Sequence, residues 1–302
     1  MKIPVIIIIF NRPEKTKLLF NSISKYKPEN LFIISDGPRN NHEGDLEKVL
    51  ESREIFKNID WNCEIFFNNS EKNLGCRERI ISGLNWVFEK VDKAIILEDD
   101  CIPSKEFFPF MEEMLIKYQI NHKIGSICGS NLLSKWDRNK DSYFYSKYCN
   151  CWGWGTWRDR WQKIDTNLDN LEVSKSKKIL KSYLGSYRAH IYWHFILNKV
   201  KKKKIDSWAY IWSFTNFING NLHITPKYNL VSNIGIGKDS THTKTIPVKY
   251  ISSTQMKNKL NFPLTHPSSI FPDDNFDINV ENKIFSKSLY NRFIWLLKKL
   301  NS

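Results

Sequence analysis

The sequence predicts an α/β fold built on a mostly parallel central sheet flanked by helices, followed by a mixed C-terminal lobe. Two observations predict it. Short apolar runs alternate with amphipathic segments over the first 130 residues, as expected when parallel strands alternate with crossover helices. The runs are almost wholly apolar, which is typical of strands buried on both faces. A chain of 302 residues, 41% of them hydrophobic, is long enough to bury such a core.

Each predicted strand is a short aliphatic or β-branched run. The first is nearly all isoleucine and valine and ends at Asn11-Arg12-Pro13, so we interpret it as a buried strand rather than a signal peptide. Polar or turn-forming residues follow most of the later runs. The strands are expected at residues 3–10, 31–35, 63–67, 94–97 and 124–128.

The segments between these runs have the spacing of amphipathic helices. Pro13 and Glu14 begin the first helix, because proline is favoured in the first turn. Its inner residues are expected to be Leu18, Leu19, Phe20 and Ile23. The other helices are expected at residues 43–56, 78–90 and 107–118.

The second half of the chain has weaker periodicity and is rich in Trp, Tyr, Asn and Lys. We expect mixed strands and helices packed onto the sheet there. The tail, residues 286–302, mixes apolar residues with lysine and arginine and predicts a basic amphipathic helix. The expected organisation is a first half at residues 1–130, a second half of the same domain at 131–250 and an extension at 251–302.

The chain is strongly basic. Lysine and arginine outnumber aspartate and glutamate by 46 to 32, a formal net charge of +14. This favours anionic partners such as nucleic acid, acidic lipid or phosphorylated small molecules, although many lysines only solvate a surface. We expect no nucleic-acid partner, because no recognised motif for one is present. The six cysteines lack disulfide or zinc spacing, which favours reduced thiols and a cytoplasmic location. No run reaches the roughly 20 apolar residues of a spanning helix.

Three adjacent acids, Glu98-Asp99-Asp100, directly follow the apolar run at 94–97. Carboxylates at the end of a buried strand are costly unless they meet water or a cation. Their oxygens suit Mg²⁺ or Mn²⁺, which bind one or two carboxylates together with substrate phosphates. The alternative is a solvated acidic turn or a helix N-cap, since a helix is expected shortly after Asp100.

Polar clusters also lie beyond other predicted strands, at Asn11-Arg12, Asp36-Gly37 and Asn73-Leu74-Gly75. Ligands of open parallel sheets bind beyond the carboxyl ends of the strands. We therefore expect these clusters and the acidic triplet to form one site, although an ordinary turn explains each cluster taken alone.

The apolar strand, the acidic triplet and the following Cys101-Ile-Pro-Ser-Lys-Glu-Phe-Phe resemble nucleotide-sugar glycosyltransferases of the GT-A (Rossmann-like) fold. That group includes the Golgi N-acetylglucosaminyltransferase that initiates hybrid N-glycans and bacterial sugar transferases of surface-polysaccharide loci. The resemblance covers roughly residues 3 to 245. It implies that Asp100 ligates a divalent ion, Mn²⁺ or Mg²⁺, with Glu98 and Asp99 in support.

The resemblance also implies roles for the other strand-end residues. Asn11 and Arg12 would contact the nucleotide of a UDP-sugar. Asp36 would hydrogen-bond the uracil. The residues expected beside the ribose and diphosphate are Asn73, Gly75 and Arg77.

Two tryptophan-bearing segments resemble the acceptor side of the family. Cys151-Trp-Gly-Trp-Gly-Thr-Trp157 would line the sugar and acceptor pocket through Trp154 and Trp157, because indole faces stack on sugar rings; the alternative is a tryptophan-rich core layer. Asp206 resembles the family's catalytic acid, which takes the proton of the acceptor hydroxyl; the alternative is a helix cap. Ala209 departs from the family's pattern at this segment.

Residues 229–243 form a glycine- and serine-rich stretch that contains Lys238 and His242. The resemblance implies a loop that orders over the donor diphosphate and excludes water. His242 would reach a phosphate or the metal, and Lys238 would neutralise phosphate charge. The alternative is a mobile loop with an incidental histidine.

Lys199 and Lys201–Lys204 form a basic run. Together with the basic tail it predicts a peripheral contact with anionic lipid on the inner face of the plasma membrane. The alternative is a solvated surface.

Together these features predict a metal-dependent glycosyltransferase of the hexosyltransferase type. It would move a sugar from a nucleotide-sugar donor, with inversion, to a glycan or lipid-linked glycan acceptor in bacterial surface polysaccharide synthesis, with the second half on the acceptor side. Two alternatives stay open. A sugar-phosphate nucleotidyltransferase usually has a glycine-rich loop after the first strand, where this chain has Asn11-Arg12-Pro13. A non-enzymatic nucleic-acid-binding protein would fit the charge.

Overall fold

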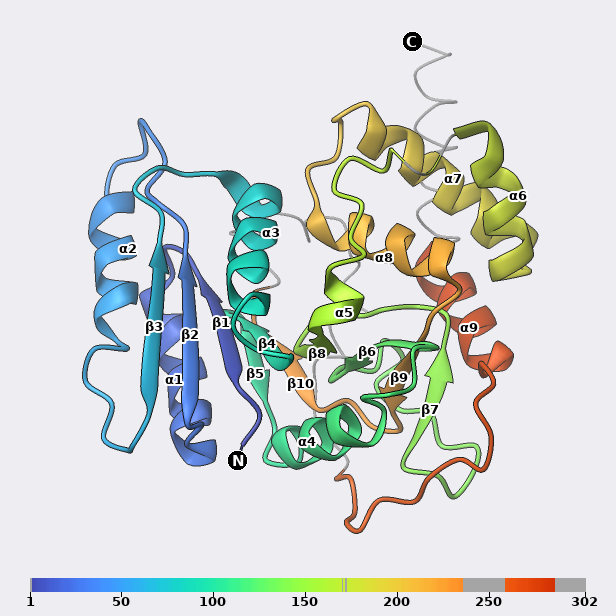
Figure 1. Ribbon diagram of the computed structural model, residues 1–302, viewed down its shortest axis with the longest axis horizontal. Helices are drawn as coiled ribbons and strands as arrows, with labels where there is room; N and C mark the ends of the chain where they lie inside the picture. Colours follow the sequence, from blue (N-terminus) through green and yellow to red (C-terminus); the bar gives the residue numbers. More distant parts are fainter. Residues whose placement is uncertain (1, 170, 172, 236–258, 286–302) are drawn as a thin grey trace.

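The computed structural model describes residues 2–169, 171, 173–235 and 259–285 (Figure 1). The strands are β1 (Val5–Ile9), β2 (Asn30–Ser35), β3 (Glu64–Asn69), β4 (Lys93–Glu98), β5 (Cys101–Pro103), β6 (Ile124–Cys128), β7 (Tyr143–Ser146), β8 (Trp154–Trp157), β9 (Leu222–Pro226) and β10 (Val231–Asn233). The helices are α1 (Pro13–Tyr26), α2 (Asp45–Glu54), α3 (Gly75–Phe88), α4 (Phe107–Lys117), α5 (Arg158–Trp161), α6 (Val173–Leu184), α7 (Tyr187–Lys201), α8 (Trp208–Asn219), α9 (Asp274–Val280) and the π-helix η2 (Glu281–Phe285).

An eight-stranded sheet forms the centre of the molecule, in the order β3-β2-β1-β4-β8-β6-β9-β7. The first four of these strands are parallel to one another, and β6 is parallel to β9. Strands β8 and β7 run antiparallel to their neighbours. The predicted α/β fold with a mostly parallel sheet and flanking helices is therefore confirmed.

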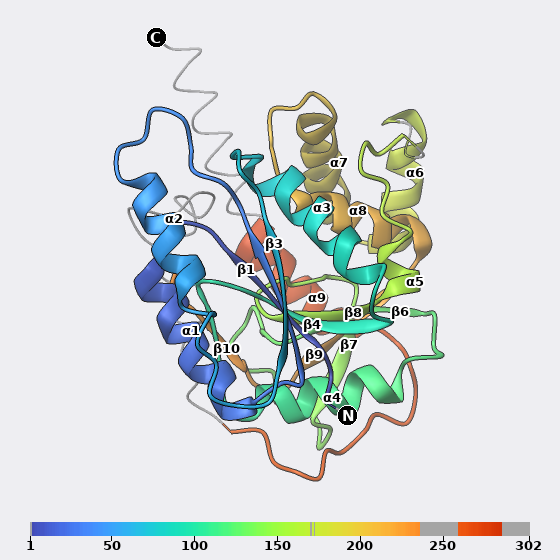
Figure 2. The ribbon, with the colours of Figure 1, turned by 60° about the vertical axis from the view of Figure 1, so that its left-hand side comes forward.

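The core lies on both faces of this sheet because successive side chains of a strand point to opposite faces. Along β1, Ile6 and Ile8 pack on the face covered by α3, α5, α7 and α8. Val5, Ile7 and Ile9 pack on the opposite face with α1 and α4. All five side chains are buried, which accounts for the unbroken apolar run in the sequence. Figure 2 shows α1 and α3 on opposite sides of the parallel strands.

The second half contributes strands that extend the sheet, and its helices α5, α7 and α8 pack onto one face of the sheet as expected. Strand β8 inserts between β4 and β6 and pairs antiparallel with both. Its Trp-Gly-Thr-Trp sequence fits between two neighbours because Gly155 lies close to the Leu115 side chain and the Ala94 carbonyl, where a Cβ would be crowded. The pattern was too short to be predicted as a strand.

A second, two-stranded sheet pairs β5 with β10 in antiparallel register. This pairing brings residues 231–235 against the acidic triplet, although more than 130 residues separate the two segments in the chain. The carbonyl of Asp100 accepts a hydrogen bond from the amide of Ile234 at 2.8 Å.

The predicted helices form with small shifts at their ends. Leu19 and Ile23 of α1 are buried as expected, whereas Leu18 is 51% exposed and was wrongly placed inside. Within the described ranges, no helix has both the length and the apolar character needed to span a membrane. The predicted tail helix, residues 286–302, lies outside the described residues.

Candidate active site

The carboxyl ends of β2, β1 and β4 meet at one edge of the sheet. The parallel register aligns Ile9 with Ser35 and places Glu98 beside Ile8. The chain turns away at each of these points. The polar residues that follow the three strands are therefore brought together, as parallel strands require.

Arg12 links two of these strand ends. Its Nη1 donates to Asp99 Oδ1 and to Asp100 Oδ2, each at 3.1 Å. Burial acts to lower the pKa of Arg12, but the attraction of Asp99 and Asp100 outweighs it and the net shift is upward. Asp99 also accepts a hydrogen bond from the amide of Phe10. It is 5% exposed, so this carboxylate serves mainly to anchor Arg12.

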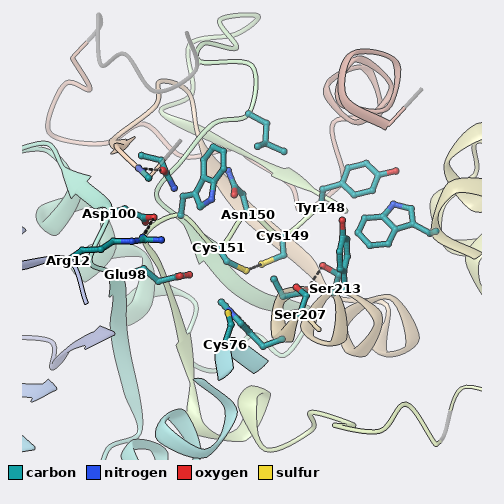
Figure 3. Close-up of a pocket in the computed structure, with 18 residues that line it drawn as sticks. Arg12, Cys76, Glu98, Asp100, Tyr148, Cys149, Asn150, Cys151, Ser207 and Ser213 are labelled. Atoms are coloured by element: carbon teal, nitrogen blue, oxygen red, sulfur yellow. Dashed lines mark hydrogen bonds and ion pairs between the residues drawn. The ribbon is translucent and has the colours of Figure 1, made fainter. Parts of the chain in front are cut away.

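Glu98 and Asp100 turn toward a shared space, and both line the larger of two adjoining cavities (Figure 3). Burial raises the pKa of Glu98, and the neighbouring negative charges of Asp100 and Asp99 raise it further. Like charges held close in a partly buried site disfavour ionisation unless a cation offsets them.

Four carboxylates surround Cys76, which is the second residue of α3. Burial raises the pKa of its thiol, and further increases come from the negative charges of Glu98, Asp206, Asp36 and Asp100. These acids come from three separate segments of the chain, because Glu98 and Asp100 both lie at the end of β4. The structure therefore brings together the residues that the sequence placed at different strand and helix ends.

Asp36 shapes the loop between β3 and α3. Its carboxylate accepts hydrogen bonds from three backbone amides: Gly37 and Leu74 at 2.9 Å and Gly75 at 3.1 Å. Asn73 completes the contact by donating to the Gly37 carbonyl at 2.8 Å. A carboxylate has about four acceptor positions, so Asp36 retains capacity for one further donor.

A smaller cavity of about 200 Å³ opens beside this loop. Its walls come from Phe10, Asp36, Arg39, Asn73 and Gly75, together with Arg12 and Arg79. The Arg39 guanidinium lies over the Phe10 ring, 5.4 Å from its centroid. The cavity thus combines an aromatic ring, carbonyl and carboxylate acceptors and several guanidinium groups.

Asn11 and Arg39 are fixed by one buried acid. Asp45 accepts from Asn11 at 2.6 Å and from two nitrogens of Arg39 at 2.7 and 2.9 Å. The Arg39 bonds hold the pKa of Asp45 well below its usual range. Asn11 does not line either cavity in the described structure, so it supports the wall instead of facing a ligand.

The larger cavity has a volume of about 330 Å³ and a different lining. Arg12, Glu98 and Asp100 form its charged side. Figure 3 shows Tyr148 and Ser213 on the side opposite these charges. Its aromatic lining consists of Tyr148, Trp152, Trp193, Trp208 and Tyr210.

Gly235 seals the charged side of this cavity. A Cβ at this position would lie 1.9 Å from Asp100 Oδ2, so only glycine lets the backbone approach the carboxylate. The Gly235 amide donates to Asn233 Oδ1 at 2.8 Å. Lys238 and His242 follow shortly in the sequence but lie outside the described residues.

The structure corrects the placement of Trp154 and Trp157. Both side chains are buried, at 0% and 1% exposure, and neither lines the cavities. Trp154 stacks on Trp208 at 5.4 Å between ring centroids, and Trp157 donates from Nε1 to the Leu115 carbonyl at 2.9 Å. They point to opposite faces of the sheet because they belong to a strand. The alternative interpretation, a core layer, describes them.

Asp206 is exposed and immediately precedes the N-cap of α8. A Cβ on Gly75 would lie 3.6 Å from Asp206 Oδ2, so the carboxylate faces the loop before α3. Asp206 lines a neighbouring hollow with Arg77 and Lys203, whereas Ser207 and Trp208 line the larger cavity. Arg77 is held away from both cavities by its bond to the Thr166 carbonyl at 2.6 Å.

Sequence analysis missed most of the aromatic lining and the thiols beside it. Trp152 belongs to the same tryptophan-rich segment as Trp154. It lines the cavity because it precedes β8, whereas Trp154 is the first residue of β8 and is buried. Cys149 and Cys151 face the cavity with their sulfur atoms 3.8 Å apart. The local sequence around Cys149 and Cys151 carries no signal that places these thiols in the same cavity as Glu98.

Carboxylates are the candidate metal ligands of this site. Among the described residues, no group of three or more His, Cys, Asp or Glu side chains could hold an ion by itself. Glu98 and Asp100 nevertheless supply two hard oxygen ligands on one cavity wall. That is the usual protein share for Mg²⁺, whose remaining positions are filled by phosphate and water. These two carboxylates fit such an ion, although Asp100 also pairs with Arg12. Asp99 does not line this cavity and is nearly fully buried, so it is not placed to share the ion.

No family model matches the sequence, and no curated protein matches it. Among solved structures, a protein from Bacillus anthracis described as a glucose-1-phosphate thymidylyltransferase aligns with 57% of this chain and 80% of its own, at 14% identity and a TM-score of 0.30. A UDP-glucose pyrophosphorylase in complex with UDP-glucose aligns with 84% of this chain and 97% of its own, at 10% identity and a TM-score of 0.39. Likeness at this level decides neither the detailed fold nor the activity.

Proposed function

We propose that this protein is a metal-dependent glycosyltransferase that moves a sugar from a nucleotide-diphosphate donor to a hydroxyl acceptor. The position of Arg12, Glu98 and Asp100 on one wall of the larger cavity, with Asp36 in the adjoining smaller cavity, carries the proposal. A concentration of carboxylates next to Arg12 suits a site that binds a cation together with phosphate.

Glu98 and Asp100 would hold Mn²⁺ or Mg²⁺. A bound ion of this kind stabilises the negative charge that develops on a diphosphate leaving group. Arg12 adds a fixed positive charge on the same wall, and its pairing with Asp99 keeps its side chain oriented. A preoriented charge of this kind needs little reorganisation during reaction.

The smaller cavity would take the nucleoside. Phe10 offers a ring face, Asp36 has an acceptor position left for a base N–H, and Arg39 supplies donors for ribose or phosphate oxygens. The larger cavity would take the sugar and the acceptor, because aromatic faces bind the apolar faces of pyranose rings.

Asp206 is the proposed general base. The acceptor oxygen would bond to the anomeric carbon as the bond from that carbon to the diphosphate oxygen breaks. The hydroxyl proton would pass to the Asp206 carboxylate. Its position between the Gly75 loop and the start of α8, beside the residues that line the larger cavity, supports this role.

A thermal-shift screen of nucleotide-sugars with and without Mn²⁺, followed by a transfer assay with the best donor, tests the proposal. We expect a stabilising donor whose effect requires the ion. Stabilisation that is the same in EDTA would contradict the metal role, and stabilisation by nucleotide triphosphate with pyrophosphate release would favour the alternative nucleotidyltransferase.

A further inference from the structure

The positive charge of the chain is concentrated in one helical hairpin. Residues 173–205 contain no Asp or Glu, and their basic residues are Lys175, Lys177, Lys178, Lys181, Arg188, Lys199, Lys201, Lys202, Lys203 and Lys204. Removing these ten from the 46 basic residues leaves 36 against 32 acids, a surplus of only 4 for the other residues. Most of the net charge of +14 therefore belongs to this segment.

Helices α6 and α7 place this charge at the outside of the molecule. Both views of the fold show them at the end away from α4, with α8 between α7 and the sheet (Figures 1 and 2). The side chains of Lys178, Lys181, Arg188 and Lys202 are exposed. No described residue forms an ion pair with the three lysines, so their charge is directed to solvent.

Apolar side chains are exposed next to this charge. Tyr187 begins α7 directly after the turn at Gly185 and is 73% exposed, and Ile191, one turn later, is 38% exposed. The opposite face of the helix is buried, as Ala189 and Trp193 show. An aromatic and an aliphatic side chain beside lysines and arginine is the composition of a surface that lies in a membrane interface.

We propose that the α6–α7 hairpin is a docking surface for anionic lipid bilayers. The occupant is identified by charge complementarity together with the exposed Tyr187 and Ile191. Nucleic acid would account for the lysines and could stack on Tyr187, but it would leave the exposed aliphatic Ile191 without a role. Trp193, on the inner face of α7, lines the larger cavity, so docking would bring that cavity close to the bilayer surface.

Co-sedimentation of the full chain with phosphatidylcholine vesicles, with and without phosphatidylglycerol, tests this proposal. We expect binding only to the anionic vesicles and weakening by salt. Replacing Lys178, Lys181 and Lys202 by Glu should weaken binding by about 100-fold or more, because each lysine near an anionic surface contributes about fivefold.

The matched control replaces Lys17, Lys25 and Lys48, which are exposed on α1 and α2, by Glu and so makes the same change in net charge. It should retain most of the binding. Tyr187→Ser should weaken vesicle binding several-fold at unchanged charge. Equal losses in the two triple variants, no effect of Tyr187→Ser, or binding of a single-stranded oligonucleotide without any binding of the anionic vesicles would each overturn the proposal. A failure of sugar transfer would not, since the docking surface stands independently of the proposed function.

Discussion

The two cavities that meet at Glu98 differ in the sequence separation of the residues that line them. The smaller cavity is built from residues 8–99, mainly from the segments that follow parallel strands. The larger cavity combines the same strand ends with residues 132–235, including the segment before β8, the start of α8 and β10. The first is set by neighbouring βα units, whereas the second exists only after the two halves of the sheet have joined.

Their chemistry differs in the same way. The smaller cavity has more charged groups in its wall, where five residues are arginines or aspartates fixed by backbone hydrogen bonds or ion pairs: Arg12, Asp36, Arg39, Arg79 and Asp99. Aromatic rings and thiols dominate the larger cavity. Phosphate and base atoms of a nucleotide bind charged and polar groups, whereas a sugar ring packs on aromatic faces. The proposed function therefore assigns the nucleotide to the smaller cavity and the sugar to the larger one.

Removing Asp100, the proposed metal ligand on the wall of the larger cavity, should give the largest effect. Asp100→Ala should lower transfer by about 10³-fold or more, because a metal site supplies several kcal/mol of charge stabilisation. The ion-dependent part of donor binding should be lost as well. Transfer rates and donor titrations with and without Mn²⁺ measure this.

Asp60→Ala, an exposed acid far along the chain from the strand ends, serves as the control for loss of charge. It should leave both measurements unchanged. Full activity of Asp100→Ala in EDTA would show that the acidic triplet has no role in the chemistry.

Asp206→Asn should separate chemistry from donor binding. We expect kcat to fall by about 10²–10⁴-fold, the usual contribution of a general base. The affinity for the donor should stay the same, because the amide keeps the shape of the side chain at the Gly75 loop. An unchanged kcat would exclude Asp206 as the base.

Truncating one aromatic residue in each cavity should affect different ligands, the donor in the smaller cavity and the acceptor in the larger one. Phe10→Ala should weaken donor binding by about tenfold and leave the acceptor KM nearly unchanged, whereas Trp152→Ala should raise the acceptor KM by about tenfold. Both side chains are half-buried. Donor titrations and acceptor saturation curves test the pair. If both variants changed the same parameter, the division of ligands between the cavities would be wrong.

Two buried carboxylates, Asp277 and Asp45, should affect the pH dependence of the free energy of unfolding in different ways. Burial raises the pKa of Asp277 to about 7, although Ser146 and the Lys147 amide hydrogen-bond to it. When folding raises the pKa of an acid, ionisation of that acid lowers the free energy of unfolding. The loss is complete above the folded pKa and absent below the unfolded pKa, which is near 4. The gain in unfolding free energy from Asp277→Asn should therefore rise with pH from about 4 to 7, by about 1 kcal/mol per unit.

Asp45 behaves in the opposite sense beside the smaller cavity. Its Arg39 bonds hold the pKa of Asp45 below the unfolded value, so its stabilisation is fully present above about pH 4. Asp45→Asn should lower the free energy of unfolding by an amount that is constant between pH 5 and 8. Chemical denaturation at several pH values measures both variants, and a pH-independent effect of Asp277→Asn would contradict the burial argument.

Parts of this picture could be predicted from local sequence. The unbroken apolar runs gave the parallel strands, and the polar residues after them, Arg12, Asp36 and Asp100, lie together as expected. These features were predictable because they depend on residues that are close together in the sequence. Side chains alternate along a strand, and adjacent parallel strands end at one edge, so position in the chain specifies position in the sheet.

The sequence by itself determined the sheet, the acidic strand end and the surplus of lysine at residues 173–205. Only the tertiary structure decided which tryptophans face the cavity, because the insertion of β8 between β4 and β6 buries Trp154 and Trp157 and leaves Trp152 at the wall. The physical reason is that strand pairing over long sequence separations fixes which face of a segment is covered. A segment of four residues carries too few side chains to specify that choice locally.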